Sequence, residues 1–237
     1  MITKKSNSVE DSDFTSGEVI LIDKHAGVSS FYIVKVIRGI TKVKKVGHAG
    51  TLDPNATGLL VVCTGKKTKE IYKFQDAQKV YSGTMVLGQR TASMDSEAEV
   101  IEEKPINHVD SYLIASKIPQ FVGTIKQVPP MFSALKHKGK PLYKYARNGV
   151  DVKREPREVT ISSFEVTDIE MPRIKFRVNC SKGTYVRVLA DDFGKALGTV
   201  AFLETLRREA IGQLNVIDAL SLEEFETLYK SRINLEM

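Results

Sequence analysis

The sequence predicts an α/β fold of the α+β type, in which a mixed, largely antiparallel sheet is flanked by helices. Segments that alternate apolar and polar residues come in runs, and helical segments stand between them without a regular strand-helix repeat. The clearest alternation is at 79–91, where successive side chains would face opposite sides of a sheet. With 237 residues, the chain is long enough to bury a sizeable core. These observations favour a mixed sheet over a parallel sheet built from repeated strand-helix-strand units.

The N-terminal part of the chain predicts a tail, a strand and a helix. Residues 1–16 are polar and lack periodicity, so we expect a flexible tail. The segment "EVILIDK" predicts a short buried strand, and Ser29 or Ser30 can cap the helix that follows. The core face of this helix is predicted from apolar residues at helical spacing: Phe31, Val34, Ile37 and Ile40.

The rest of the chain predicts further strands and helices. The apolar run "GLLVVCTG" predicts an interior strand, and "KKTKEIYKF" predicts a helix after it. Further strands are predicted at 121–126, 158–169 and 173–180, and further helices near 109–117, 141–148 and 184–197. Ser221 and Glu224 have the spacing of a capping box, which predicts the start of the last helix.

The charge of the chain suits a polyanionic partner. The net charge is +6, and the positive residues occur in clusters such as Lys42, Lys44 and Lys45. A basic surface of this kind fits nucleic acid, although a solvated face would have the same composition. No apolar run approaches the ~18 residues of a membrane helix, and the polar N-terminus lacks a signal-peptide core. We therefore expect a cytoplasmic protein with no membrane partner.

Several kinds of chemistry are disfavoured by the residues. Cys63 and Cys180 lie in apolar, strand-like segments without the paired spacing of a zinc site, so we expect buried free thiols. The four histidines are dispersed, which disfavours a catalytic metal. The glycines before Lys66 lack the spacing of a phosphate-binding loop, and no G-x-S-x-G segment occurs. We expect neither a cofactor nor a metal.

The stretch "GHAGTLDPNATGLLVVCTG" contains the candidate reactive group. Aspartate, proline and glycine in this order are typical of a turn, and a plain turn is one interpretation of Asp53. The other is a carboxylate that Pro54 holds still for chemistry. In "NCSKGTYVRVLADDFG", Arg187 lies at the start of a helix and could pair with a carboxylate through two hydrogen bonds, lowering its pKa. Taken alone, Arg187 fits a surface residue at the start of a helix better.

Five segments together resemble the bacterial tRNA pseudouridine synthase B family. They occur in the family's order between Ile20 and Gly212: "GHAGTLDPNATGLLVVCTGKKTK", "KVYSGTMVLGQRTASMDSE", "VPPMFSALKHKGKPLYKYARNG", "CSKGTYVRVLADDFG" and "LRREAIG". The resemblance implies the pseudouridine synthase catalytic fold and isomerisation of one T-loop uridine of tRNA, at position 55, to pseudouridine. The N-glycosidic bond is cut, the base rotates, and its C5 is joined to the same ribose without cofactor or metal.

The resemblance also implies roles for individual residues. Asp53 is the catalytic aspartate, Arg187 pairs with it, and Tyr81 stacks on the target base and can assist proton removal from C5. The residues implied to bind substrate are His48, Lys24, Leu206 and Tyr185. The match at Lys24 is weaker, because His25 stands where the family usually has proline.

The resemblance suggests how the chain is divided. We expect a flexible tail at 1–16, a catalytic domain at 17–214 and a C-terminal helix or tail at 215–237. Family members usually carry a small C-terminal RNA-binding domain, but 215–237 is shorter than the ~40 residues that a domain needs to fold alone. We expect a monomer whose partner is the T-arm of tRNA.

Two other functions stay open at this point. One is an RNA-binding or tRNA-folding protein that uses the same basic surface without catalysis. The other is a nucleosidase or base-excision glycosylase, which would release free uracil. The residues also leave open whether Asp53 attacks C1′ or removes a ribose proton.

Overall fold

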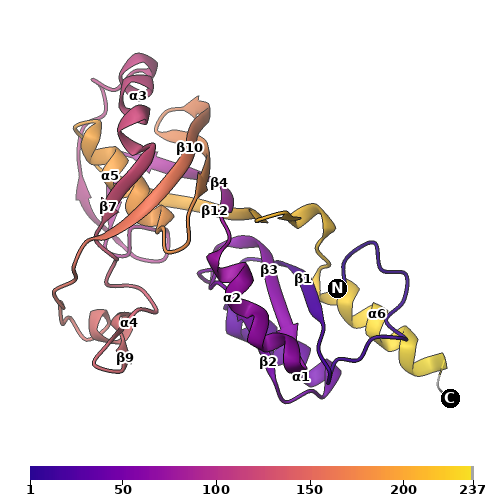
Figure 1. Cartoon of the computed structure of the whole chain (residues 1–237). Helices are drawn as coiled ribbons and strands as arrows, with labels where there is room; N and C mark the ends of the chain where they lie inside the picture. Colours follow the sequence, from indigo (N-terminus) through magenta and orange to yellow (C-terminus); the bar gives the residue numbers. More distant parts are fainter. Residues whose placement is uncertain (236–237) are drawn as a thin grey trace. The chain divides into compact units, whose positions relative to one another are not determined.

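The chain is described here by a computed structural model of residues 1–235, in which it forms two compact units. The first unit contains Met1–Tyr81 and Leu206–Met237, and the second contains Ser82–Thr205. The chain passes from one to the other within two strands, β4 (Lys79–Leu87) and β12 (Ala201–Ile211). Figure 1 shows the strands and helices of each unit, which confirm the predicted α+β class. The assignment of 17–214 to one catalytic domain stays a prediction.

Strand β3 (Thr57–Thr64) is the centre of the sheet in the first unit. It pairs antiparallel with β1 (Val19–Lys24) and with β2 (Val46–Ala49). At its N-terminal end β3 pairs parallel with Arg207 and Arg208 of β12, which continues to β13 (Leu214–Asn215). The predicted strands β1 and β3 are confirmed. Residues 50–56 connect β2 to β3, so this loop leads directly into a strand that is buried from its second residue, Gly58, onward.

Helix α1 (Ser30–Thr41) packs on this sheet through one face. Its cap is Ser29, whose side chain accepts a hydrogen bond from the Tyr32 N–H at 3.1 Å. Ile33 and Ile37 are fully buried, whereas Phe31, predicted to face the core, is 63% exposed. That prediction is wrong because Phe31 is two residues, about 200°, away from Ile33 around the helix. The segment after β3 forms the 3₁₀ helix η1 (Gly65–Glu70) and then α2 (Ile71–Asp76).

The two ends of the chain pack into the first unit. Ile2, Val9 and Phe14 are buried, and Ile2 bridges Ile20 of β1, so residues 1–16 differ from the flexible tail that we expected. These apolar side chains cover the core without any regular spacing, which is why a search for periodicity misses them. The first unit also contains the 3₁₀ helix η3 (Val216–Asp218).

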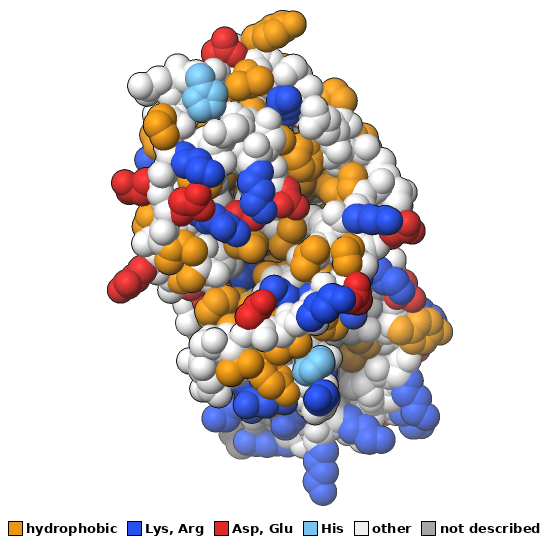
Figure 2. All heavy atoms as spheres, turned by 90° about the vertical axis from the view of Figure 1, so that its left-hand side faces the viewer, with side chains coloured by type: hydrophobic (Ala, Val, Ile, Leu, Met, Phe, Trp, Pro, Cys, Tyr) orange, Lys and Arg blue, Asp and Glu red, His pale blue; other side chains and the backbone are white. Residues whose placement is uncertain are grey.

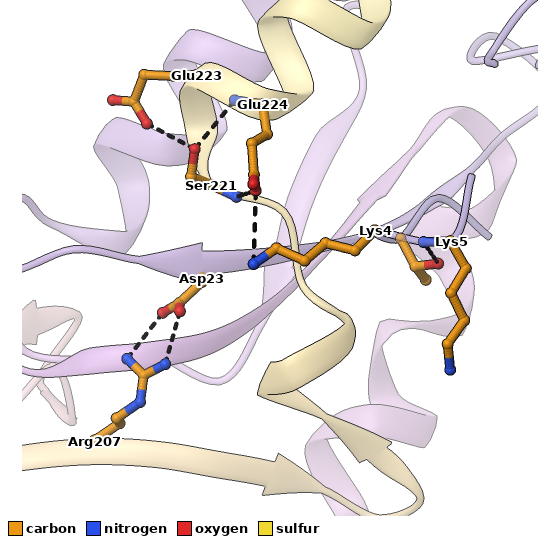
Figure 3. A network of polar contacts seen from close by, with 8 residues as sticks. Lys4, Lys5, Asp23, Arg207, Ser221, Glu223 and Glu224 are labelled. Atoms are coloured by element: carbon orange, nitrogen blue, oxygen red, sulfur yellow. Dashed lines mark hydrogen bonds and ion pairs between the residues drawn. The ribbon is translucent and has the colours of Figure 1, made fainter. Parts of the chain in front are cut away.

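Helix α6 (Leu222–Leu235) begins at the predicted capping box. The Ser221 hydroxyl accepts a hydrogen bond from the Glu224 N–H at 3.1 Å, and the Glu224 carboxylate accepts one from the Ser221 N–H at 2.6 Å. Figure 3 shows both residues at the start of the helix. The fully buried Phe225 packs edge-on against Phe14, with ring centroids 6.3 Å apart. The capping box is confirmed.

The second unit has a sheet in the order β4, β11, β10 and β7. Strand β10 (Arg157–Glu170) pairs antiparallel with both β11 (Arg173–Cys180) and β7 (Gly123–Gln127). Phe164 of β10 packs edge-on against Phe193, with ring centroids 5.2 Å apart. The other strands form two short pairs: β5 (Gln89–Thr91) with β6 (Val100–Glu103), and β8 (Lys136–His137) with β9 (Lys140–Pro141).

The α-helices of the second unit match the predicted positions: they are α3 (Ser111–Lys117), α4 (Leu142–Ala146) and α5 (Val186–Ala196). The 3₁₀ helix η2 (Ile118–Phe121) was not predicted, and it includes Phe121, the first residue of the strand predicted at 121–126. The strand predicted at 79–91 is interrupted after Leu87, because Gly88 takes a φ of +85°. Cys63 and Cys180 are both buried free thiols, as predicted.

Candidate active site

Asp53 lies in the loop that connects β2 to β3. Its carbonyl accepts a hydrogen bond from the Ala56 N–H at 3.1 Å, so the segment is a turn, as the local sequence predicts. Leu52 and Ala56 are buried on either side, and Asp53 itself is half-buried. Neighbours anchored in the core hold the backbone of this carboxylate in place.

Two buried polar side chains, Ser30 and Lys24, form hydrogen bonds with the backbone of the Asp53 loop. The Ser30 hydroxyl accepts a hydrogen bond from the Leu52 N–H at 2.8 Å and donates one to the Leu52 carbonyl at 3.0 Å. The Lys24 ammonium is fully buried and donates to the Pro54 carbonyl at 2.9 Å. It also donates to the carbonyls of His25 and Val28, at 2.9 and 2.8 Å. Lys24 therefore supports the turn, and its contact with substrate stays a prediction.

Arg208 closes the loop from β12. This side chain is only 1% exposed, and it donates to the Leu59 carbonyl at 2.7 Å and to the Gly50 carbonyl at 3.0 Å. These two carbonyls stand on opposite sides of Asp53 in the sequence. At Gly58 the backbones approach so closely that a Cβ would lie 2.3 Å from the Arg208 carbonyl oxygen. Sequence reasoning missed Arg208, and the only signal was its place in "LRREAIG".

His48 lies on β2, opposite Val62 of β3. Burial, reinforced by the Arg208 cation, lowers the pKa of His48, and a hydrogen bond to the Gly50 backbone opposes this only in part. The imidazole is therefore neutral at neutral pH. A neutral ring next to the Asp53 loop can pack against a base without competing for the carboxylate.

The first unit consists of two chain segments: Tyr81 is the last residue of the N-terminal one, and Leu206 is the first residue of the C-terminal one. Both residues are half-buried. The Leu206 carbonyl lies 3.5 Å from the Thr57 hydroxyl of β3. The next residue, Arg207, pairs with both carboxylate oxygens of Asp23, at 3.0 and 2.7 Å (Figure 3). This ion pair fastens β12 to the end of β1 that bears Lys24.

Arg187 belongs to the second unit, where it is 5% exposed. Its guanidinium donates to the carbonyls of Ser93 and Phe132, at 3.1 and 2.8 Å, and forms an ion pair with Asp95 at 3.2 Å. The surface interpretation of Arg187 is therefore wrong. Its pairing with Asp53 stays a prediction.

The backbone that carries Tyr185 and Arg187 is held by Gln127 at the end of β7. The Tyr185 N–H donates to the Gln127 side chain at 3.0 Å, and the Gln127 amide donates back to the Tyr185 carbonyl at 3.3 Å. Gln127 is 2% exposed. Of the residues named from the sequence, the structure thus places Lys24, His48, Asp53, Tyr81 and Leu206 in the first unit, and Tyr185 and Arg187 in the second.

The chemistry of these residues centres on a carboxylate. A carboxylate on a loop whose backbone is held by buried hydrogen bonds is preorganised to act as a nucleophile or base. Among residues 1–235 no group of three or more His, Cys, Asp or Glu side chains could hold a metal ion.

None of the helices in that range is long and apolar enough to cross a membrane. Lys and Arg side chains gather at the lower end of the face in Figure 2. Fold and site define an enzyme with one candidate catalytic carboxylate and a basic surface.

Comparison with known proteins narrows this class. The family model described as "TruB family pseudouridylate synthase (N terminal domain)" matches residues 38–186. Over 221 residues the chain is 46% identical to the tRNA pseudouridine synthase B of Flavobacterium johnsoniae, covering 90% of this chain and 96% of that protein. It is 48% identical over 219 residues to that of Desulfotalea psychrophila, covering 90% and 89%. The chain belongs to the TruB family of pseudouridylate synthases, which are isomerases.

Solved structures support the same fold. The chain superposes on a chain of a Cbf5-Nop10-Gar1 complex with a TM-score of 0.74 and 27% sequence identity, covering 100% of this chain and 61% of that one. A protein chain in the structure of an H/ACA RNP bound to a substrate RNA containing 2′-deoxyuridine has a similar fold, with a TM-score of 0.71 and 24% identity, covering 100% of this chain and 64% of that one. The chain thus spans less than two thirds of each of these two chains. The pseudouridine synthase fold expected from the sequence is confirmed.

Proposed function

We propose that the protein isomerises one uridine of tRNA, the T-loop uridine at position 55, to pseudouridine. The observation that carries this proposal is that Asp53 lies on a turn whose backbone is held by Ser30 and Arg208, in a chain 46% identical to a protein named tRNA pseudouridine synthase B. The basic surface supports the choice of an RNA substrate, because a net charge of +6 favours a polyanion. We further propose that the protein works as a cytoplasmic monomer.

The reaction rearranges bonds within one nucleotide. The bond between C1′ and N1 breaks, the uracil rotates, and a bond between C1′ and C5 forms while the C5 proton moves to solvent and N1 regains one. Product and substrate are isomers, so no co-reactant is consumed. The Asp53 carboxylate either attacks C1′ or removes a ribose proton, and both routes need its negative charge. A glycoside hydrolase would use a second carboxylate to activate a water molecule. In the isomerisation no water takes part in the bond exchange at C1′.

The other residues prepare the base for this step. A uridine inside a folded loop must be flipped out, at a cost of a few kcal/mol. Stacking on Tyr81, worth about 1–3 kcal/mol, offsets part of that cost. In this proposal, following the family resemblance, Arg187 is the partner of Asp53, Leu206 and Tyr185 contact the base, and the neutral His48 occupies the space that the flipped nucleotide vacates. In this proposal Lys24 acts through the Pro54 carbonyl, which it contacts at 2.9 Å.

The proposal is tested by incubating the protein with an unmodified tRNA transcript and mapping pseudouridine. We expect pseudouridine at one T-loop position, with no change in RNA mass. Free uracil in the supernatant would indicate a glycosylase instead. Tight binding without any pseudouridine, under conditions where a known synthase modifies the same transcript, would indicate an RNA-binding protein.

A further inference from the structure

The stretch between Asp23 and Asp53 has an unusual charge distribution. Residues 24–52 contain no Asp or Glu. The same stretch contains six positive residues: Lys24, Lys35, Arg38, Lys42, Lys44 and Lys45. Lys24 is buried beneath the Asp53 loop, whereas the other five lie on or just after α1. A surface of one charge sign needs an explanation, because like charges repel each other.

Helical spacing places several of these cations in one line. Phe31, Lys35 and Arg38 are separated by four and three residues, so they lie on one face of α1, and Lys42 follows directly as the C-cap residue of the helix. The opposite face carries Ile33, Val34 and Ile37, all buried in the core. Lys35 and Lys42 are exposed, and Phe31 is 63% exposed. The outer face of α1 therefore presents an aromatic ring followed by a row of cations.

These cations differ from three lysines of the first unit that have acidic partners. Lys67 and Lys73 both pair with Glu70, at 2.7 and 2.9 Å, and Lys5 pairs with Asp218 at 2.7 Å. No carboxylate in the described part of the chain lies within ion-pair distance of Lys35 or Lys42. Their positive charge is left for a ligand.

We propose that this outer face of α1 binds the sugar-phosphate backbone of the RNA strand flanking the target uridine, with Phe31 stacking on a base. The proposal rests on the proposed function. The start of α1 lies beside the candidate catalytic loop, because Ser30 contacts Leu52 at 2.8 Å. From there the 12 residues of α1 extend about 18 Å, at ~1.5 Å per residue, to Thr41, and Lys42 follows. The row of cations thus leads away from Asp53 along a path that a polynucleotide can follow.

The test compares two double variants that remove the same charge. Lys35→Gln/Lys42→Gln removes two cations without acidic partners, and Lys67→Gln/Lys73→Gln removes two cations that are paired with Glu70. The dissociation constant of an unmodified tRNA transcript is measured from about 50 to 200 mM salt. We expect the slope of log K against log salt to fall by about 1.4–1.8 in the first variant only, since each lost phosphate contact removes ~0.7–0.9.

Two further readouts make the outcome decisive. Phe31→Ala should weaken binding about fivefold or more, without changing the salt slope. An equal loss of slope in both double variants would overturn the inference, because overall charge would then be responsible. No loss of slope in either would overturn it as well. Binding is measured without turnover, so this test is independent of pseudouridine formation. If the protein makes no pseudouridine but the slope of log K against log salt falls only in Lys35→Gln/Lys42→Gln, the proposed function is refuted and the RNA-binding surface on α1 is supported.

Discussion

At the scale of single residues, the Arg208 guanidinium joins the Gly50 and Leu59 carbonyls, which flank the Asp53 loop. A planar guanidinium can reach both carbonyls at once, whereas a lysine ammonium is a single point of charge. Because Arg208 is buried, it acts as a positioning residue that touches no substrate. Sequence reasoning had little chance of finding it, since buried arginines are rare and nothing local marks them.

We expect Arg208→Lys to lower kcat by about 100-fold, the loss typical of a catalytic group displaced by about 1 Å. Affinity for tRNA should change by less than about threefold, because the side chain is not on the surface. Steady-state kinetics and a binding titration of the same variant separate the two effects, and thermal unfolding checks that it is folded. A raised KM with an unchanged kcat would show that Arg208 affects binding instead.

His48 should make the stability of the fold depend on pH. Its pKa in the folded state lies below the ordinary value of 6.5, so below that pH the unfolded chain binds more protons than the folded one. The stability contributed by the neutral ring is complete above about pH 6.5 and is lost as the pH falls through the folded-state pKa. We expect His48→Gln to lose less unfolding free energy than the wild type between pH 7 and 5. The control is His25→Gln, which removes an exposed histidine; equal pH profiles for the wild type and His48→Gln would contradict this.

At the scale of elements, β12 shows where the sequence was insufficient. Strands β1, β3, β10 and β11 were predicted because their apolar patterns are local. The residues of β12, "AFLETLRREAI", include several strong helix formers, and its charges find partners only in the folded protein. Arg207 pairs with Asp23 of β1, and Arg208 pairs with carbonyls of the loop and β3. Tertiary contacts therefore override the local preference.

The capping box of α6 is the element whose contribution is easiest to measure. Ser221→Ala removes the acceptor of the Glu224 N–H and should lower the unfolding free energy by about 1 kcal/mol. For a chain of this size the melting temperature would fall by about 2–4 °C. Ser231→Ala, in the same helix and exposed, should change it much less. Equal effects of the two substitutions would mean that the cap contributes nothing particular.

At the scale of the whole molecule, the chain divides into two units at positions that its composition does not mark. Both passages lie inside strands, β4 and β12, and no linker of glycine, proline or serine separates the units. The five family segments predicted Asp53, which lies in the first unit, and Arg187, which lies in the second. They identified these residues by pattern, whereas the supporting contacts of Ser30, Arg208 and Gln127 required coordinates.

If recognition is concentrated on the T-arm, an isolated T-arm stem-loop should be a good substrate. It carries the uridine and enough backbone to cover the outer face of α1, a helix of 12 residues that is about 18 Å long. We expect its kcat/KM to be within about tenfold of that of whole tRNA, a difference of ~1.4 kcal/mol in transition-state stabilisation. Steady-state assays of both RNAs at low and moderate salt make the comparison. A stem-loop hundreds of times poorer would show that other parts of tRNA are recognised.

The central claim is that the Asp53 carboxylate performs the isomerisation. Its most direct test is the release of tritium from tRNA labelled at C5 of uridine, measured for the wild type and for Asp53→Asn. The amide keeps the shape of the side chain but lacks its charge and nucleophilicity. We predict stoichiometric release with the wild type and none with Asp53→Asn, while tRNA binding persists in the variant. Release by Asp53→Asn within tenfold of the wild-type rate would contradict the account.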